Sequence, residues 1–267
     1  MAEKYFQTRQ FKDATFEQVD FSGATFHTVD LAGITIRDAD LTGATIVSAE
    51  IEGLRVSSFA DLRMTVVVND IDVTDYVEGE LDRRYPERVQ LRDVTTVEDH
   101  RAMWDTIEQL WAESRAHAET LSEEMRNERV GDEWSFVQTM RHLVMAIDTW
   151  IGRMIHQDPT ANHPLGLPPT DASAETIAEL GADVDATPSY GDVVALHEQR
   201  RAQVRAVLDT LTESQLDEPR TATLATEWGE ETRTVRQCLR TVFAEHIAHR
   251  RFIERDLAIL ESRGVSS

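Results

Sequence analysis

A large apolar residue recurs at every fifth position through the first part of the chain, and this repeat limits the fold more than any other feature. The recurring positions are Phe6, Phe11, Phe16, Phe21, Phe26, Leu31, Ile36, Leu41, Ile46, Ile51 and Val56. A second apolar residue, usually a small one, stands two positions before most of them: Ala14, Val19, Ala24, Val29, Ile34, Ala39, Ala44, Ala49 and Leu54. A period of five fits neither an α-helix nor a β-strand. It is typical of a chain that turns a corner every five residues and points one large and one small side chain inward at each corner.

The residues around these positions closely resemble the pentapeptide-repeat family. The stretch 31–46 reads LAGITIRDADLTGATI, and the stretch before it carries the same pattern as VDFSGATF. The resemblance implies a short right-handed quadrilateral β-helix in which the Phe, Leu and Ile residues form an inner ladder. The repeats extend over residues 6–58, which is only about two and a half coils. Because stacked repeats need neighbours and capped ends, we expect so short a stack to depend on the rest of the chain.

The charge of the chain narrows the range of partners. Its net charge is −22, from 49 acidic and 27 basic residues. Nucleic-acid binding requires a basic surface that neutralises phosphates, and anionic membrane lipid attracts basic segments, so we expect neither partner. Residues 1–60 hold nine acidic and five basic residues, a net charge of −4. This modest charge and the short stack also make imitation of DNA an unfavoured alternative.

The single cysteine and the absence of targeting signals favour the cytoplasm. Cys238 has no partner for an internal disulfide, which suits a reducing compartment. It stands among Val235, Leu239 and Val242, where burial would keep the thiol unreactive. The opening residues lack the apolar region of a signal peptide, and no apolar run reaches the roughly 18 residues of a membrane span.

Residues 63–93 are predicted to connect the repeats to a helical domain. Met64 to Val73 reads MTVVVNDIDV, which favours a small hairpin around Asn69 and Asp70. Thr74 or Asp75 is then expected to cap a short helix that ends near Arg84, before Pro86.

From Val94 onward the strand signals vanish and helical periodicity takes over. Four long helices with two extended connections, 157–189 and 217–233, are typical of a four-helix bundle. We therefore predict an α+β multidomain protein with a β-helix at 1–62, a connector at 63–93 and a bundle at 94–267. The long helices are expected at 97–125, 136–155, 190–211 and 234–262, with a short one at 174–180.

The last predicted helix carries a histidine pattern with metal-ligand spacing. Glu245 and His249 are four residues apart, so they lie one above the other on one helical face and could hold a single ion. His246 and His249, three residues apart, could do the same. The spacing alone leaves Glu245 and His246 as alternatives.

Two helices together resemble the DinB-like bundle family over roughly residues 95–262. The motifs are GDEWS at 131–135 before a helix with Arg141, His142 and Leu143, and the closing helix EHIAHRRFIERDL from Glu245. In that family a Trp-Ser pair precedes a helix with a metal-binding histidine, and Glu-x-x-x-His or His-x-x-x-His completes the site. The resemblance implies the metal ligands His142, Glu245 and His249. His246 remains the alternative to Glu245, because it lies nearer the centre of the apolar face of its helix.

The position of His142 on its own helix leaves two interpretations. The densest apolar stripe of that helix does not include His142, which shares a face with Thr139, Ala146 and Thr149. Small neighbours could leave room for a metal ion and a ligand, or they could mark a face exposed to solvent. The family resemblance favours the metal site.

The ligand set implied by the resemblance suits a catalytic metal. Two imidazoles and one carboxylate are ligands for Zn²⁺, Ni²⁺ or Fe²⁺, and three protein ligands leave positions open for water or substrate. The Glu-x-x-x-His form looks like that of mycothiol-dependent transferases and isomerases, which implies a low-molecular-weight thiol as cofactor and a small-molecule substrate. The alternative is a non-enzymatic scaffold or sensor protein whose repeat segment docks a partner. A homodimer is compatible with either.

The remaining marked residues are given structural roles. Trp104 and Trp111 are predicted to be core residues, and Arg141 and Arg250 to form surface pairs rather than bind an anionic substrate. A last group of histidines has no ligand spacing and is predicted at the surface or at helix ends: His100, His117, His156, His163 and His197.

Overall fold

The computed structural model describes residues 11–16, 19–37, 39–56, 65–131 and 133–264. Phe6, Met64 and Asp132, which belong to the predicted ladder, hairpin and helix-entry motif, lie outside these ranges. The chain divides into two compact units between Glu50 and Ile51, and each unit is described by itself.

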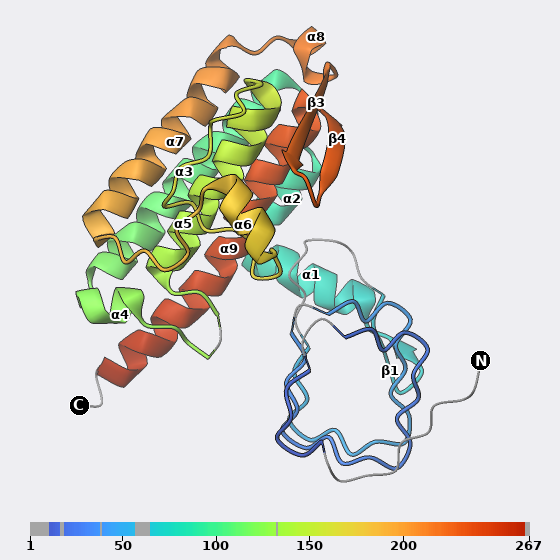
Figure 1. Ribbon diagram of the computed structural model, residues 1–267. Coiled ribbons are helices and arrows are strands. Elements are labelled where there is room, and N and C mark those ends of the chain that lie inside the picture. The colour runs from blue at the N-terminus through green and yellow to red at the C-terminus, as the bar shows by residue number, and fades with distance from the viewer. Residues whose placement is uncertain (1–10, 17–18, 38, 57–64, 132, 265–267) are drawn as a thin grey trace. The chain divides into compact units, whose positions relative to one another are not determined.

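The first unit turns at ten-residue intervals. The backbone N–H of Ala24 donates to the carbonyl of Phe21 over 2.8 Å, and the equivalent bonds recur at Ile34 and Ala44. Gly23, in the turn between Phe21 and Ala24, has a φ of 71°, a left-handed conformation that favours glycine at this place in a type II turn. The path of the segment in Figure 1 is a four-sided coil.

The phenylalanine ladder is formed, although its side chains are only half covered. Rings of Phe11, Phe16, Phe21 and Phe26 follow one another with centroids 5.5, 5.6 and 5.8 Å apart in edge-to-face contacts. Each ring nevertheless keeps about half of its surface exposed. No strand is assigned within 11–16, 19–37 or 39–56, so the β-helix and its hand remain predictions from the repeat.

The predicted small hairpin is confirmed at the start of the helical part. Strands β1 (Val67–Val68) and β2 (Ile71–Asp72) pair in antiparallel fashion. Asn69 and Asp70 have φ values of 49° and 63°, as a type I′ turn requires.

Two short helices follow the hairpin, and one of them was not predicted. Helix α1 spans Thr74–Arg84 and its N-cap residue is Val73, so the prediction of Thr74 or Asp75 as the cap was wrong. The Oδ1 atom of Asp72 accepts from the Thr74 N–H. Helix α2 (Glu87–Arg92) begins directly after Pro86. Proline favours the first turn of a helix as well as the region after its end, so Pro86 both follows α1 and opens α2.

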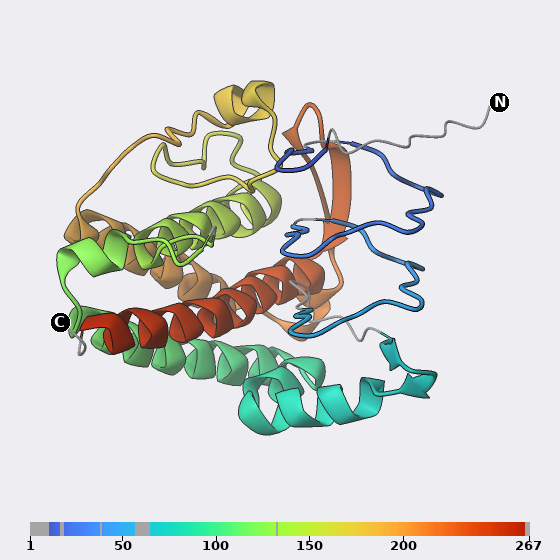
Figure 2. The ribbon, with the colours of Figure 1, turned by 90° about the horizontal axis from the view of Figure 1, so that it is seen from below.

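The second unit is mostly helical, and four long segments are packed together. Helix α3 contacts both α7 and α9, and α5 contacts the same two helices, an arrangement that Figures 1 and 2 show from two sides. Trp104 and Trp111 are fully buried in the core, as predicted. The helices are α3 (Val97–Glu119), α4 (Glu123–Asn127), α5 (Phe136–Ile147) with its π-helical continuation η1 (Asp148–Ile155), α6 (Ala174–Leu180), α7 (Tyr190–Thr210), α8 (Glu213–Leu216) and α9 (Val235–Gly264).

The connection before α9 contains a β-hairpin, so the prediction of no strands after Val94 was wrong. Strands β3 (Pro219–Ala225) and β4 (Gly229–Thr234) are antiparallel. The two strands are half exposed and rich in Thr and charged residues, so they lack the apolar pattern that predicts a strand. Arg153 of η1 binds the ribbon by donating to the carbonyls of Thr223 and Leu224.

No helix in the described ranges combines the length and the apolar character that crossing a membrane requires.

Candidate metal site

Helices α5 and α9 bring the three predicted ligands together. The Oε2 atom of Glu245 lies 3.5 Å from His142 Nε2 and 3.2 Å from His249 Nε2. One potential ligand atom from each of the three residues falls within 4.8 Å of the others. His142 is thus brought from another helix to the Glu245–His249 pair.

His142 is buried and held in one orientation by the loop that follows η1. Its Nδ1–H donates to the carbonyl of Leu167 over 2.9 Å, so its Nε2 atom faces Glu245. The neighbours on its helical face, Thr139, Ala146 and Thr149, are buried as well. The interpretation of this face as solvent-exposed is therefore excluded.

Glu245 places a negative charge between two imidazoles. Burial raises the pKa of its carboxyl, but the neighbouring His142 and His249 outweigh burial and hold the pKa well below its usual range. The buried Oε2 atom nevertheless accepts no well-aligned hydrogen bond. A buried acceptor without a hydrogen bond needs an explanation, and a cation held jointly with the two imidazoles would supply it.

The surroundings of His249 favour its neutral form. Burial lowers the pKa of its imidazole, and Glu245 opposes this shift only in part. Trp134 stacks on His249 with ring centroids 5.7 Å apart and lies 4.5 Å from the ring of His142. Metal binding requires neutral imidazole, so the shift favours a metal over a proton.

His246 lies in the core rather than with the cluster. Its Nδ1–H donates to the carbonyl of Val242, and its Nε2 atom is 3.3 Å from Nε2 of His197. Trp104 and Trp111 pack edge-on against its ring. The helix thus directs Glu245, and not His246, toward His142 and His249.

Two further predictions about polar residues were wrong. His197 lies inside α7 and is 0% exposed, rather than at the surface or at a helix end, whereas His100 does lie in the first turn of α3, although it is buried. Arg141, predicted to form a surface pair, is buried and donates to backbone carbonyls of the loop after η1. Arg250 does form ion pairs, with Glu87 and Glu113.

The buried His197–His246 pair is expected to make the fold sensitive to acid. Burial lowers the pKa of His246 to about 3 and that of His197 well below its usual range. Below about pH 6.5 the unfolded chain therefore takes up protons that the folded chain does not. The free energy of unfolding should fall by up to about 1.4 kcal/mol per pH unit for each histidine until the folded value is reached.

Urea unfolding of the metal-free protein at about pH 7 and pH 5.5 measures this slope. The variant His197→Gln should show a shallower pH dependence than the wild type. An equal slope in both proteins would show that the pair does not control acid stability.

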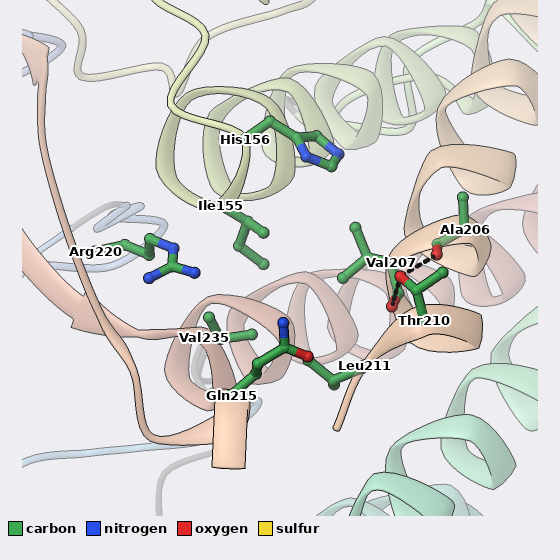
Figure 3. A pocket seen from close by; sticks show the side chains of 9 residues that line it. All are labelled: Ile155, His156, Ala206, Val207, Thr210, Leu211, Gln215, Arg220 and Val235. Carbon is green, nitrogen blue, oxygen red and sulfur yellow. Dashed lines mark hydrogen bonds between the residues drawn. The ribbon is translucent and has the colours of Figure 1, made fainter. Parts of the chain in front are cut away.

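One cavity in the described part of the chain is separate from the cluster. It measures about 240 Å³ and is lined by residues of η1, α7, α8, β3 and α9, including Ile155, Val207 and Leu211 (Figure 3). Its α9 residue, Val235, precedes His249 by 14 positions, which is about 20 Å along a helix. Arg220 in its wall is already bound to Glu218. We assign this cavity no part in the site.

The structure thus defines a helical domain with a buried His–Glu–His cluster between two long helices. Residues 106–253 match the family model of the DinB superfamily, and residues 10–52 match eight copies of the pentapeptide repeat. The first match covers more than half of the chain and contains all three cluster residues, and the chain belongs to the DinB superfamily. Comparisons with curated proteins and with solved structures found no match.

Proposed function

We propose that this chain is a metal-dependent enzyme of the DinB superfamily whose metal ion is held by His142, Glu245 and His249. The observation that carries the proposal is the buried Oε2 atom of Glu245, which lies between two imidazole Nε2 atoms and accepts no well-aligned hydrogen bond. Nitrogen and carboxylate ligands in this ratio suit Zn²⁺, Ni²⁺ or Fe²⁺. The three ligands come from helices of a four-helix bundle made by α3, α5 with η1, α7 and α9.

The proposed reaction is transfer or isomerisation that uses a low-molecular-weight thiol of the mycothiol type. A metal ion at such a site supplies Lewis-acid chemistry that lowers the pKa of a thiol or water. Cys238 is unsuited to act as the nucleophile, because it is fully buried and burial raises the pKa of its thiol to about 11. The thiol would therefore come from a small molecule, and the substrate would be a small electrophile.

Metal analysis of the purified protein tests the proposed site. The wild type is expected to carry about one divalent ion per chain, and His249→Ala should lose it, because the variant removes one of three ligands. Equal, negligible metal in both proteins would refute the site. Release of a thiol conjugate from a panel of electrophiles would then test the reaction.

The alternative function is docking of a partner by the repeat unit. It is favoured by two observations: the repeat unit supplies none of the cluster residues, and its apolar ladder is half exposed. Turnover of a thiol conjugate by residues 65–267 alone, at the rate of the full chain, would count against a required docking role. A shortened protein that begins at residue 65 keeps α2, which packs against α3 and α9.

A further inference from the structure

The loop between η1 and α6 lies directly on α5, on the side that carries His142. Gly166 approaches the helix so closely that a Cβ atom at this position would be 3.1 Å from the Cβ atom of Met145. The N–H of Leu167 donates to the carbonyl of Arg141 over 3.1 Å. The carbonyl of the same Leu167 accepts from Nδ1 of His142.

The buried guanidinium of Arg141 holds this loop in place through hydrogen bonds to its backbone. Its Nε donates to the carbonyl of Leu165 over 2.9 Å, Nη1 to that of Ala186 over 2.8 Å, and Nη2 to that of Asp183 over 2.5 Å. Arg141 is only 2% exposed. One side chain therefore joins two distant parts of the segment before α7, and one of the joined carbonyls is two residues from Leu167.

From these contacts we infer that Arg141 is a positioning residue for His142, which it holds in the metal-binding orientation through the loop and the Leu167 carbonyl. The inference rests on the proposed function for the statement that His142 binds a metal. The control of the His142 ring orientation by Arg141 does not depend on that function. The hydrogen bond to Leu167 fixes a proton on Nδ1 and leaves the Nε2 atom directed at Glu245. Partners of this kind set the tautomer and ring orientation of a ligand histidine.

Arginine is suited to this role in a way that lysine is not. Its planar group presents five donors in a fixed fork, and three carbonyls are bound here from different directions. A lysine at the same position carries the charge but cannot reproduce that arrangement. We therefore expect Arg141→Lys to retain part of the effect and Arg141→Gln to lose most of it.

The experiment uses full-length protein and has two readouts. Long-range ¹H–¹⁵N NMR of the metal-free protein reports which ring nitrogen of His142 carries the proton. Chelator competition reports the affinity for Zn²⁺. We expect a single Nδ1–H tautomer in the wild type, a mixture in Arg141→Gln, and a loss of Zn²⁺ affinity of about 10–100-fold in that variant, with Arg141→Lys between the two.

Arg101→Gln is the matched control. Arg101 of α3 also donates to three backbone carbonyls of another segment, those of Leu208, Asp209 and Leu211, and none of them belongs to the loop over His142. The control should keep both the wild-type tautomer and the wild-type affinity. If Arg141→Gln fails to fold, Arg141→Lys and Gly166→Ala replace it, since the added Cβ displaces the same loop without a change of charge.

The outcomes separate this inference from the proposed function. Wild-type tautomer and affinity in the Arg141 or Gly166 variants would overturn the positioning role. Equal losses in Arg101→Gln would overturn it too, because the effect would then be general destabilisation. Failure of wild-type protein to bind Zn²⁺, with the tautomer still dependent on Arg141, would refute the metal site and leave the structural part of the inference standing.

Discussion

Glu245→Gln is expected to lower the affinity for a divalent metal ion by more than about 100-fold, which exceeds the loss typical for a residue that only supports a ligand. The substitution keeps the size of the side chain but removes the negative charge that lies between His142 and His249. Two neutral imidazoles and an amide would then face the ion with no charge to compensate it. Zn²⁺ titration of the metal-free protein by calorimetry or chelator competition measures the change.

The control for this prediction is His246→Gln, which changes the other residue that the spacing allows as a ligand. His246 is fully buried and hydrogen-bonded within the core, so the variant should lose stability but keep its affinity for Zn²⁺. The reverse result, with metal lost in His246→Gln and kept in Glu245→Gln, would contradict the ligand assignment.

Asp148→Ala is expected to reduce the free energy of unfolding by about 3–5 kcal/mol, the usual cost of leaving one charge of a buried pair alone. Asp148 is 2% exposed, and its Oδ1 accepts from Nε of Arg200 over 2.5 Å. Its Oδ2 accepts from the N–H of His163 over 2.9 Å. The variant therefore removes the acceptor of two buried donors at once, the guanidinium of Arg200 and the backbone N–H of His163 in the loop after η1. Urea unfolding at neutral pH measures the loss.

A second substitution shows whether the stranded charge is the cause. Asp148→Ala combined with Arg200→Met should be more stable than Asp148→Ala alone, since no charge is then left unpaired. Asp105→Ala removes a partner of Arg205 at an exposed ion pair and should cost less than about 1 kcal/mol. If the double variant is no more stable than the single one, the ion pair does not explain the effect.

Much of the fold could be predicted because two periods dominate the sequence. The five-residue period located the repeats, and helical periodicity placed the long helices close to their observed limits. The β3–β4 hairpin could not be predicted, because its strands face solvent on one side and carry no apolar alternation. Thr221, for example, lies opposite Thr232. Periodicity also failed for α5, whose residues are buried on nearly every side. The loop after η1 covers the face that includes His142, and no periodic signal reveals where a loop will lie.

The candidate site was also predictable only in part. The spacing of Glu245 and His249 indicated that both could hold one ion, while His142 came only from the family resemblance. The apolar face of α9 could also have decided between the alternatives. The residue nearest the centre of that face, His246, is the one that enters the core, and Glu245 at its edge turns toward α5. A histidine well inside an apolar face is thus better read as a core residue than as a ligand.

Because His142 and Glu245 are far apart in sequence, an ion bound to both would close a loop through coordinate bonds, and that loop contains the segment after η1, α7 and the β3–β4 hairpin. Such a cross-link restricts the unfolded chain far more than the folded one, and the unfolded chain does not present the three ligands together. The binding free energy would then add to the folding free energy, and the melting temperature would rise with the concentration of free metal. The ion would thus act as a reversible cross-link between α5 and α9.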